Sequence, residues 1–386
     1  MAIQQAAMTR SSTRRWRHVR EHLTGYLFIA PAVLIITVFG LFPIFYAFYM
    51  SLHRWRVRKG AFIGLANYEK AIGDWVGLLL FVAGILILVA AYYVWNSAFR
   101  TYQTRGFVAR LIVALLLIAA GVVLSSGWGR MMAKGDADFL GSLQITLYYA
   151  LGTVPAELLI ALVLAYLLFQ KIRGQEMFRM IYFLPYITPV VATAVVFRTI
   201  FSPRETSLAN QALSLLGLPP QKWLFEPTPI NQILFGGEWS GFLAGPSLSL
   251  VSVIFFGIWT YVGYNTVIFL AGLGSIPNAL YEAAEIDGAN GVQMFRHITL
   301  PLLSPVTFYL SLIAFIGTFK AFNHIYVMRT PAALGTVDTA SVTIFDTFYK
   351  ANQYGYATAQ AILLFFIILG LTLAQNKVFG ERVFYG

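Results

Sequence analysis

The chain contains a long stretch without a charged side chain at residues 239–281, WSGFLAGPSLSLVSVIFFGIWTYVGYNTVIFLAGLGSIPNALY. About 20 apolar residues in a helix cross the hydrocarbon core of a bilayer, so the stretch is long enough for one crossing. Strands of a membrane barrel would alternate apolar and polar residues over short segments, and this run does not. The stretch therefore indicates a membrane-spanning helix, whose backbone groups bond to one another within the lipid.

The composition of the whole chain also indicates a protein surrounded by lipid. Hydrophobic residues make up 58% of the 386 residues and charged residues 11%, whereas a soluble protein carries about a quarter of its residues charged. We therefore expect an all-α, polytopic membrane protein. The net charge of +11 comes largely from arginines beside apolar runs, where they anchor helices to lipid headgroups, so it does not indicate a nucleic-acid partner. Cysteine is absent and the five histidines lack paired spacing, which argues against a metal site.

The apolar runs predict eight transmembrane helices. They are expected at 23–52, 75–99, 111–129, 139–170, 180–198, the C-terminal part of 239–281, 301–325 and 355–376. Five arginines before the first run favour a cytoplasmic N-terminus, but the basic cluster at 54–59 directly after it argues the other way. Charge alone leaves the orientation of the chain open.

The loop after the sixth run reads YEAAEIDGANGVQMFRHITLP, residues 281–301. Residues 282–289 can form about two helical turns, in which Ala283 and Ala284 are small enough for close docking. Gly288 is placed to end the helix, and Pro301 is placed to start the next span. Taken alone, the acidic residues would fit a solvated loop with a short amphipathic helix.

The spacing of this loop resembles the signature of importer-type ABC transporter permeases: EAA, three residues, Gly, nine residues, then I-x-L-P. The resemblance is closest to the sugar-importing class of the maltose and glycerol-3-phosphate type, and it extends over most of the chain. Further matches are Tyr26–Pro31, Phe42–Pro43, Phe62–Tyr68, Phe183–Pro185, Trp259, Leu270–Leu273, Ile325–Met328 and Gly355–Ala357.

The resemblance implies an architecture. Residues 1–22 would be a basic cytoplasmic N-terminus, residues 23–52 the first transmembrane helix, and residues 139–380 the permease core. Residues 75–129 are extra to the six-helix pattern of the class, so we expect an inserted transmembrane hairpin that packs against lipid or a neighbouring subunit. The role of this hairpin is not indicated by its residues.

The resemblance also implies a coupling function for the loop at 278–301, which would lie in the cytoplasm together with both chain termini. The residues expected to contact the ATPase are Glu282, Ala283, Ala284, Asp287 and Gly288. The chain has no G-x-x-x-x-G-K-[ST] motif. We therefore expect no cofactor and no catalytic residue in it, and ATP would be bound and hydrolysed by a separate ABC ATPase dimer.

The same class implies three partner proteins and a location. A second permease subunit would pair with this one, the ATPase dimer would bind inside, and an extracytoplasmic sugar-binding protein would deliver the solute. The external segment at 202–246 would either contact that binding protein or cover the mouth of the bundle. The location implied is the bacterial or archaeal plasma membrane.

Polar side chains within two apolar runs are the candidate substrate contacts, because polar groups are costly in lipid. They are Thr260, Tyr261, Tyr264 and Asn265 in the sixth run and Thr318 and Asn323 in the seventh. Aromatic rings beside amides and hydroxyls suit a sugar, although such residues also join helices in bundles. No group of basic residues accompanies them, which favours a neutral sugar over glycerol-3-phosphate.

Glu157 is the one acidic residue near the centre of a predicted span. It either makes a packing or intersubunit hydrogen bond, or it relays protons. The second reading supports an alternative function, that of an ion-coupled secondary transporter of a small polar solute. Arg198 and Lys320 lie near the outer ends of their spans and are expected to serve as anchors.

Overall fold

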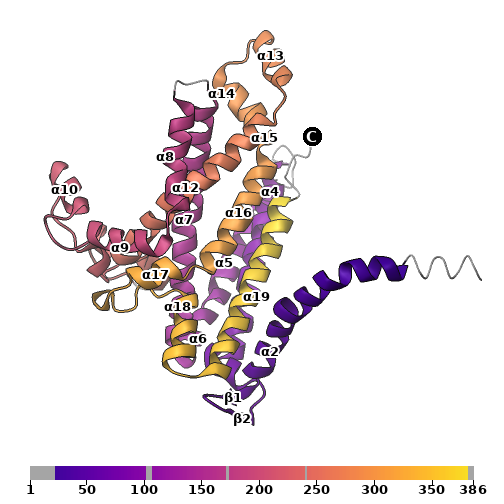
Figure 1. The fold of residues 1–386 in the computed structure, drawn as a ribbon, viewed down its shortest axis with the longest axis vertical. Coiled ribbons are helices and arrows are strands. Elements are labelled where there is room, and N and C mark those ends of the chain that lie inside the picture. Colours follow the sequence, from indigo (N-terminus) through magenta and orange to yellow (C-terminus); the bar gives the residue numbers. More distant parts are fainter. Residues whose placement is uncertain (1–21, 101–106, 171–173, 240, 381–386) are drawn as a thin grey trace, which may run out of the picture.

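The computed structural model describes residues 22–100, 107–170, 174–239 and 241–380. Helices dominate these residues, and the strands within them are β1 (His53–Trp55) and β2 (Lys59–Phe62), which pair antiparallel with His53 opposite Phe62. The long helices stand side by side in one elongated bundle (Figure 1). The prediction of an all-α polytopic membrane protein is confirmed. The predicted basic N-terminus at 1–22 lies outside the described residues except for His22.

Six helices among the described residues are long and apolar enough to cross a membrane. They are His22–Ser51, α4 (Trp75–Arg100), α5 with α6 (Phe107–Ser125 and Gly127–Lys134), α7 (Ala137–Phe169), α12 (Leu248–Gly274) and α19 (Tyr354–Phe379). Two bent helix pairs bring the number to eight if each pair counts as one span. These pairs are α8 (Gln175–Ile187) with α9 (Val190–Ile200), and Gly291–Leu302 with α16 (Ser304–Phe319).

The two bent pairs differ from the straight spans predicted at 180–198 and 301–325. The first pair turns by 96° at Thr188 and Pro189, because proline lacks an N–H and forces the residue before it out of the helical conformation. The second pair turns by 60° at Leu303, so Pro301 lies before the bend and does not start α16. These corrections matter because both bends lie in the part of the bundle that carries the candidate site.

The core of the bundle forms where α7 and α12 pack along each other. Phe256 and Leu250 are fully buried with Tyr149 in one cluster, and Phe269 and Leu273 lie in a second cluster nearer the loop at 278–301. α8 also crosses α12 at very short range, since a Cβ added at Gly263 would lie 1.6 Å from the carbonyl oxygen of Tyr182. Small residues at helix crossings are the usual basis of packing in lipid.

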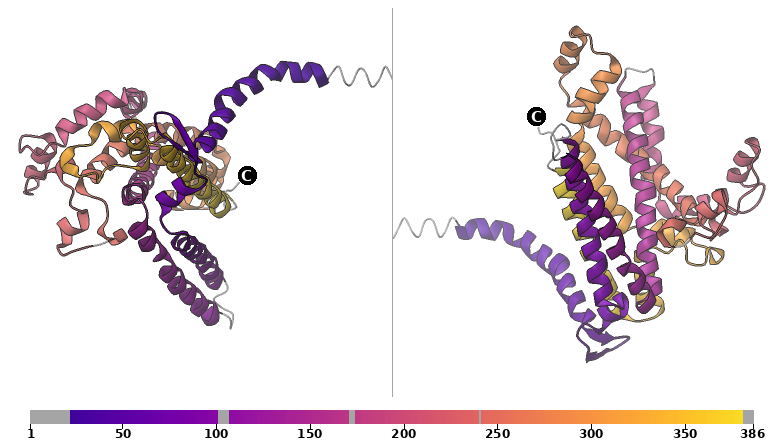
Figure 2. Two further views of the ribbon diagram at one scale, coloured as in Figure 1. Left: turned by 90° about the horizontal axis from the view of Figure 1, so that it is seen from below. Right: turned by 180° about the vertical axis from the view of Figure 1, so that it is seen from behind.

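Within the described residues, the first helix is tied to the bundle at its C-terminal end. Asn67 donates from Nδ2 to the carbonyl oxygens of Ser51 (2.7 Å) and His53 (3.2 Å). The N-terminus of α19 closes on the same point, because a Cβ at Gly355 would lie 2.3 Å from the carbonyl oxygen of His53. From here the helix passes through a π-helical segment, η1 (Ile36–Leu41), and leaves the bundle (Figures 1 and 2).

The hairpin of α4 and α5 packs against α7 and α19 near the start of α4, where Leu78 lies in one cluster with Leu140 and Leu363. Its helices run antiparallel in close contact, since a Cβ at Gly84 would lie 2.8 Å from the carbonyl oxygen of Gly121. Arg130 on α6 pairs with Asp74 at the start of α4 (Nε to Oδ2, 2.8 Å). That this hairpin is an insertion into a six-helix core remains a prediction.

The loop predicted to couple to the ATPase lies at one end of the bundle, and β1 and β2 lie at the other (Figure 1). It contains α13 (Asn278–Ile286), α14 (Gly291–Met294), the π-helical η4 (Phe295–Thr299) and α15 (Leu300–Leu302). Helix α19 ends at the same end of the bundle as α13.

Candidate functional site

The candidate site lies where two helices break. Helix α8 and helix α16 both run from the α13 end of the molecule and stop part-way along the bundle (Figure 1). Helix α9 and helix α17 (Asn323–Met328) continue sideways from these breaks and pack against each other. Discontinuous helices mark solute sites in transporters, because the break frees backbone groups and places polar atoms at mid-depth.

Two adjoining cavities occupy the space between the breaks. We call them the inner cavity, of about 140 Å³, and the break cavity, of about 230 Å³. Residues lining both are Tyr186, Tyr261, Gly317, Ala321 and His324. Since the two cavities share these walls, they lie next to each other along α12, and we treat them together as the candidate site.

All six predicted substrate residues line this site. Tyr264, Asn265 and Thr318 line the inner cavity, Thr260 and Asn323 line the break cavity, and Tyr261 lines both. The structure thus brings together residues that are far apart in the sequence. Their contact with a solute remains a prediction.

The site has an aromatic wall, and two of its threonine hydroxyls already donate within their own helices. The ring of Tyr186 stacks on that of Tyr264 with centroids 4.6 Å apart. The hydroxyls of Thr260 and Thr318 donate to backbone carbonyls of their own helices, at 2.8 Å and 3.0 Å. Those two threonines therefore offer only acceptor lone pairs, while flat rings are available for the C–H faces of a sugar.

Several residues that line the site were not among the predicted substrate contacts. Tyr149 and Glu157 on α7 and His324 on α17 line the inner cavity, and the Tyr149 hydroxyl lies 2.8 Å from Nε2 of His324. The eight-residue spacing of Tyr149 and Glu157 places them on one helix face, which was a usable signal. Lys320, expected to be an anchor, lines the break cavity instead, because α16 ends before it.

The loop residues predicted to contact the ATPase are presented on α13. Glu282, Ala283, Asp287 and Gly288 are exposed and Ala284 is partly exposed. The helix begins at Asn278, four residues before the predicted 282, and Gly288 follows its end with φ +80°. A positive φ suits glycine because it has no Cβ. Whether these residues contact an ATPase is not tested by the structure.

Side-chain contacts join this loop to the bundle. The hydroxyl of Tyr281 lies 3.0 Å from Oγ1 of Thr299 within the loop, and Tyr281 packs against a buried cluster that contains Leu168 of α7 and Leu273 of α12. The ring of Phe295 on η4 meets that of Tyr166 on α7, with centroids 4.8 Å apart. A displacement of α13 would therefore reach α7 and α12 through packed side chains rather than through a free linker.

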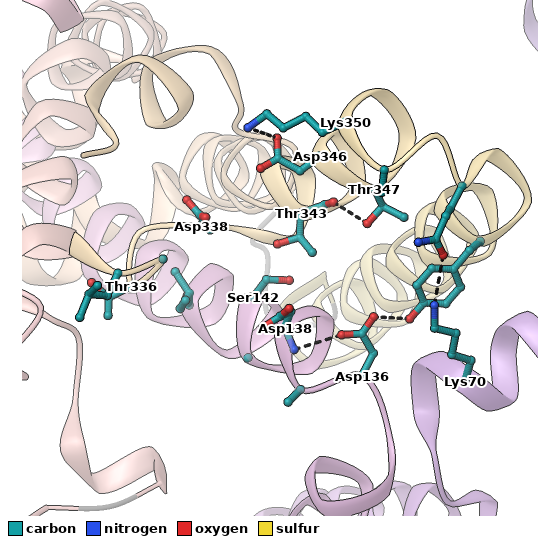
Figure 3. Close-up of a pocket in the computed structure, with 18 residues that line it drawn as sticks. Lys70, Asp136, Asp138, Ser142, Thr336, Asp338, Thr343, Asp346, Thr347 and Lys350 are labelled. Carbon is teal, nitrogen blue, oxygen red and sulfur yellow. Dashed lines mark hydrogen bonds and ion pairs between the residues drawn. The ribbon is translucent and has the colours of Figure 1, made fainter. Parts of the chain in front are cut away.

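A third cavity, of about 780 Å³, lies between the start of α7 and the segment before α19 (Figure 3). Its charged side chains are largely paired: Asp346 accepts hydrogen bonds from Arg329 and forms an ion pair with Lys350, both at 2.9 Å, and Asp136 caps α7. Burial raises the pKa of Asp338 above its usual value, with Arg329 opposing that shift. No predicted substrate residue lines this cavity, so we assign it a structural role.

The geometry of broken helices, a mid-bundle site and a protruding loop can be compared with known proteins. A family model described as "Binding-protein-dependent transport system inner membrane component" matches residues 157–384. The chain belongs to this family. It is therefore a membrane component of a transport system that depends on a binding protein.

Two curated relatives are similar over nearly their full length. The arabinooligosaccharides transport system permease protein AraP of Bacillus subtilis is 29% identical over 370 residues, covering 95% of this chain and 92% of AraP. The trehalose/maltose transport system permease protein MalF of Thermococcus litoralis is 27% identical over 361 residues, covering 93% and 94%. A bacterial ABC transporter for import of the acidic polysaccharide alginate matches in fold, with a TM-score of 0.62 at 20% identity, covering 95% and 99%.

Proposed function

We propose that the chain is the permease subunit of an ATP-driven sugar importer and that the two cavities at the helix breaks hold the sugar. The observation that carries the proposal is the convergence of all six polar candidates on two adjoining cavities between α8, α12 and α16. The names of the relatives AraP and MalF, which carry arabinooligosaccharides and trehalose or maltose, support a sugar as the solute.

The proposal includes partners that supply energy and substrate. A separate ABC ATPase dimer would bind α13, and a second permease subunit would form the other half of the translocation pathway. An external binding protein would deliver the sugar. ATP-driven closure of the ATPase would displace α13 and tilt α7 and α12 through the contacts at Tyr281 and Phe295. The site would then open outward, and ATP hydrolysis would reverse the motion.

The orientation proposed follows from the loop. If α13 faces the ATPase, the end of the bundle with α13 and the end of α19 is cytoplasmic, and the end with β1 and β2 is external. With eight spans, as when each bent pair counts as one, the N-terminus would lie on the same side as the end of α19. The plasma membrane of a bacterium or archaeon is the location that fits this assembly.

The test is a charge reversal on α13. In the complex purified through a tag on this chain and reconstituted in liposomes, Glu282→Lys should lower sugar-stimulated ATP hydrolysis and uptake by about tenfold or more, because an interfacial charge is reversed. Glu69→Lys, the reversal of an exposed acidic side chain outside both this loop and the segment 202–246, should leave both rates unchanged. Equal rates for wild type and Glu282→Lys would refute the coupling role, and uptake driven by an ion gradient without ATP would establish the secondary transporter instead.

A further inference from the structure

Three buried polar atoms in the middle of the bundle make no hydrogen bond of good geometry within the described part of the chain. They are Oγ1 of Thr153, Oε2 of Glu157 and Nδ2 of Asn265. Glu157 is 2% exposed and Asn265 is 3% exposed. Buried polar groups in proteins are almost always paired, so a cluster of unpaired ones calls for a ligand or ordered water that satisfies them.

Glu157 and Asn265 both line the inner cavity, from α7 and α12 respectively. Four tyrosines line it with them: Tyr149, Tyr186, Tyr261 and Tyr264. Among the described residues around this cavity there is no lysine or arginine to pair with the carboxyl group. Its volume of about 140 Å³ corresponds to several water molecules, which is room for polar groups of a solute.

The chemistry of these two side chains fits ring hydroxyls. A carboxyl group accepts a hydrogen bond from a hydroxyl, and the Nδ2 of an amide donates one to a hydroxyl oxygen. A carboxylate on the solute fits poorly, because no lysine or arginine lines the inner cavity to offset the cost of taking that charge out of water, and an ionised Glu157 would repel it. Lys320 lines the break cavity and not the inner one, so it does not neutralise Glu157.

We propose that Glu157 and Asn265 form the polar end of the sugar site and that Glu157 selects rings bearing hydroxyls over rings bearing a carboxylate. This inference rests on the proposed sugar transport and adds a specificity-determining residue on α7. It predicts that neutral oligosaccharides enter the inner cavity and that oligouronates, which carry a carboxylate on every ring, do not.

The chain contains no cysteine, so a single introduced thiol can report occupancy. Gly317 lines both cavities, and a Cβ added there has nothing within 4 Å. We would label Gly317→Cys with a maleimide in the assembled complex. The binding protein is left out, because its own sugar specificity would otherwise affect the protection that is measured. The probes are neutral trisaccharides of arabinose and of glucose, and trigalacturonate. Gly129→Cys, which also has open space around its Cβ, is the control thiol.

A neutral trisaccharide should protect Gly317→Cys from labelling and trigalacturonate should not. Adding Glu157→Gln, which keeps the side-chain shape, should raise the neutral concentration for half protection by about tenfold and allow trigalacturonate to protect. Gln360→Met is the matched control, since Gln360 is fully buried with an unpartnered amide but lines neither cavity. It should leave both concentrations unchanged. Size-exclusion chromatography checks that each complex assembles.

The outcomes separate the inference from the function on which it rests. If Glu157→Gln leaves both half-protection concentrations as in the wild type, or if trigalacturonate protects the wild type as well as the neutral sugars do, the role of Glu157 is overturned and sugar transport stands. If no sugar protects Gly317→Cys and none stimulates ATP hydrolysis in the wild-type complex, the proposed sugar site falls together with the inference.

Discussion

The two spans His22–Ser51 and α12 (Leu248–Gly274) are similar in length but opposite in surroundings. In α12, 61% of the most apolar 18-residue window is buried within the chain, and in the first helix none of it is. Yet α12 has the lowest mean hydropathy of the six unbroken candidate spans among the described residues, and the first helix is clearly more apolar. Of these two spans, the one with the larger buried fraction is therefore the one with the lower mean hydropathy.

The contrast follows from the solvent. Lipid tails are as apolar as leucine side chains, so apolar residues gain little by moving from lipid to a helix contact. Close helix packing comes instead from small residues, such as Gly263 against α8, and polar residues are kept out of lipid because exposure there is costly. The helix with the most glycine, serine, threonine and asparagine thus occupies the centre and carries the site.

The largest effect should come from filling a helix crossing. Gly263→Val would place a Cβ 1.6 Å from the carbonyl oxygen of Tyr182, so α8 must move away from α12, at a cost of about 3 kcal/mol. Gly25→Val makes the same change in the first helix, where nothing lies within 4 Å. Thermal unfolding of the purified complex should show a large loss for the first variant and none for the second. Equal losses would mean that the comparison of the two helices is wrong.

A smaller effect should separate stability from function on α12. Asn265→Leu removes a buried, unpartnered amide, so the melting temperature should stay equal or rise slightly, because an unpaired buried group costs about 1–3 kcal/mol. Sugar-stimulated ATP hydrolysis should nevertheless fall by about tenfold. Thr37→Leu in the first helix, where the side chain is exposed, should change neither quantity. Loss of stability in Asn265→Leu with normal stimulation would assign the amide to packing.

Much of the fold could be predicted because crossing a membrane depends on apolar length, which the sequence displays directly. The helix breaks were harder to predict. Pro189 signals one of them, but the span at 180–198 was predicted as continuous because hydropathy does not register a 96° turn. The end of α16 before Lys320 has no proline at all. Its position depends on the packing of α17 against α9, which is a tertiary contact.

The candidate site was predictable in part for a related reason. Polar residues in α12 stand out against an apolar run, so Tyr261, Tyr264 and Asn265 could be found from the sequence. Tyr186 on α8 could not, because its ring becomes a wall only when α8 crosses α12 next to Gly263. Glu157 could be recognised from the sequence as an unusual residue. The surroundings that its side chain faces could not be predicted, since a lone acidic residue can face a partner subunit or a cavity equally well.

The smallest effect should appear outside the membrane, at the segment that caps the buried helix. Asp338 lies in the loop whose Thr336 carbonyl accepts from the Ser247 hydroxyl at the start of α12 (3.5 Å). Burial raises the pKa of Asp338, so folding favours its protonated form. Its contribution to stability is therefore present below the unfolded pKa of about 3.9 and is lost as pH rises through the folded value.

Within its described residues, the first helix has no counterpart of the charged loop that contains Asp338. The dependence of the melting temperature on pH should therefore arise around α12. Asp338→Asn should flatten the fall of melting temperature between about pH 4 and pH 7, while Arg329 keeps its two bonds to Asp346 at 2.9 Å and holds the loop in place. The measurement is thermal unfolding of the complex across that range. If the melting temperature of the variant falls with pH as steeply as that of the wild type, ionisation of Asp338 does not destabilise the folded loop. The neighbouring paired charges would then be sufficient to stabilise the ionised carboxylate.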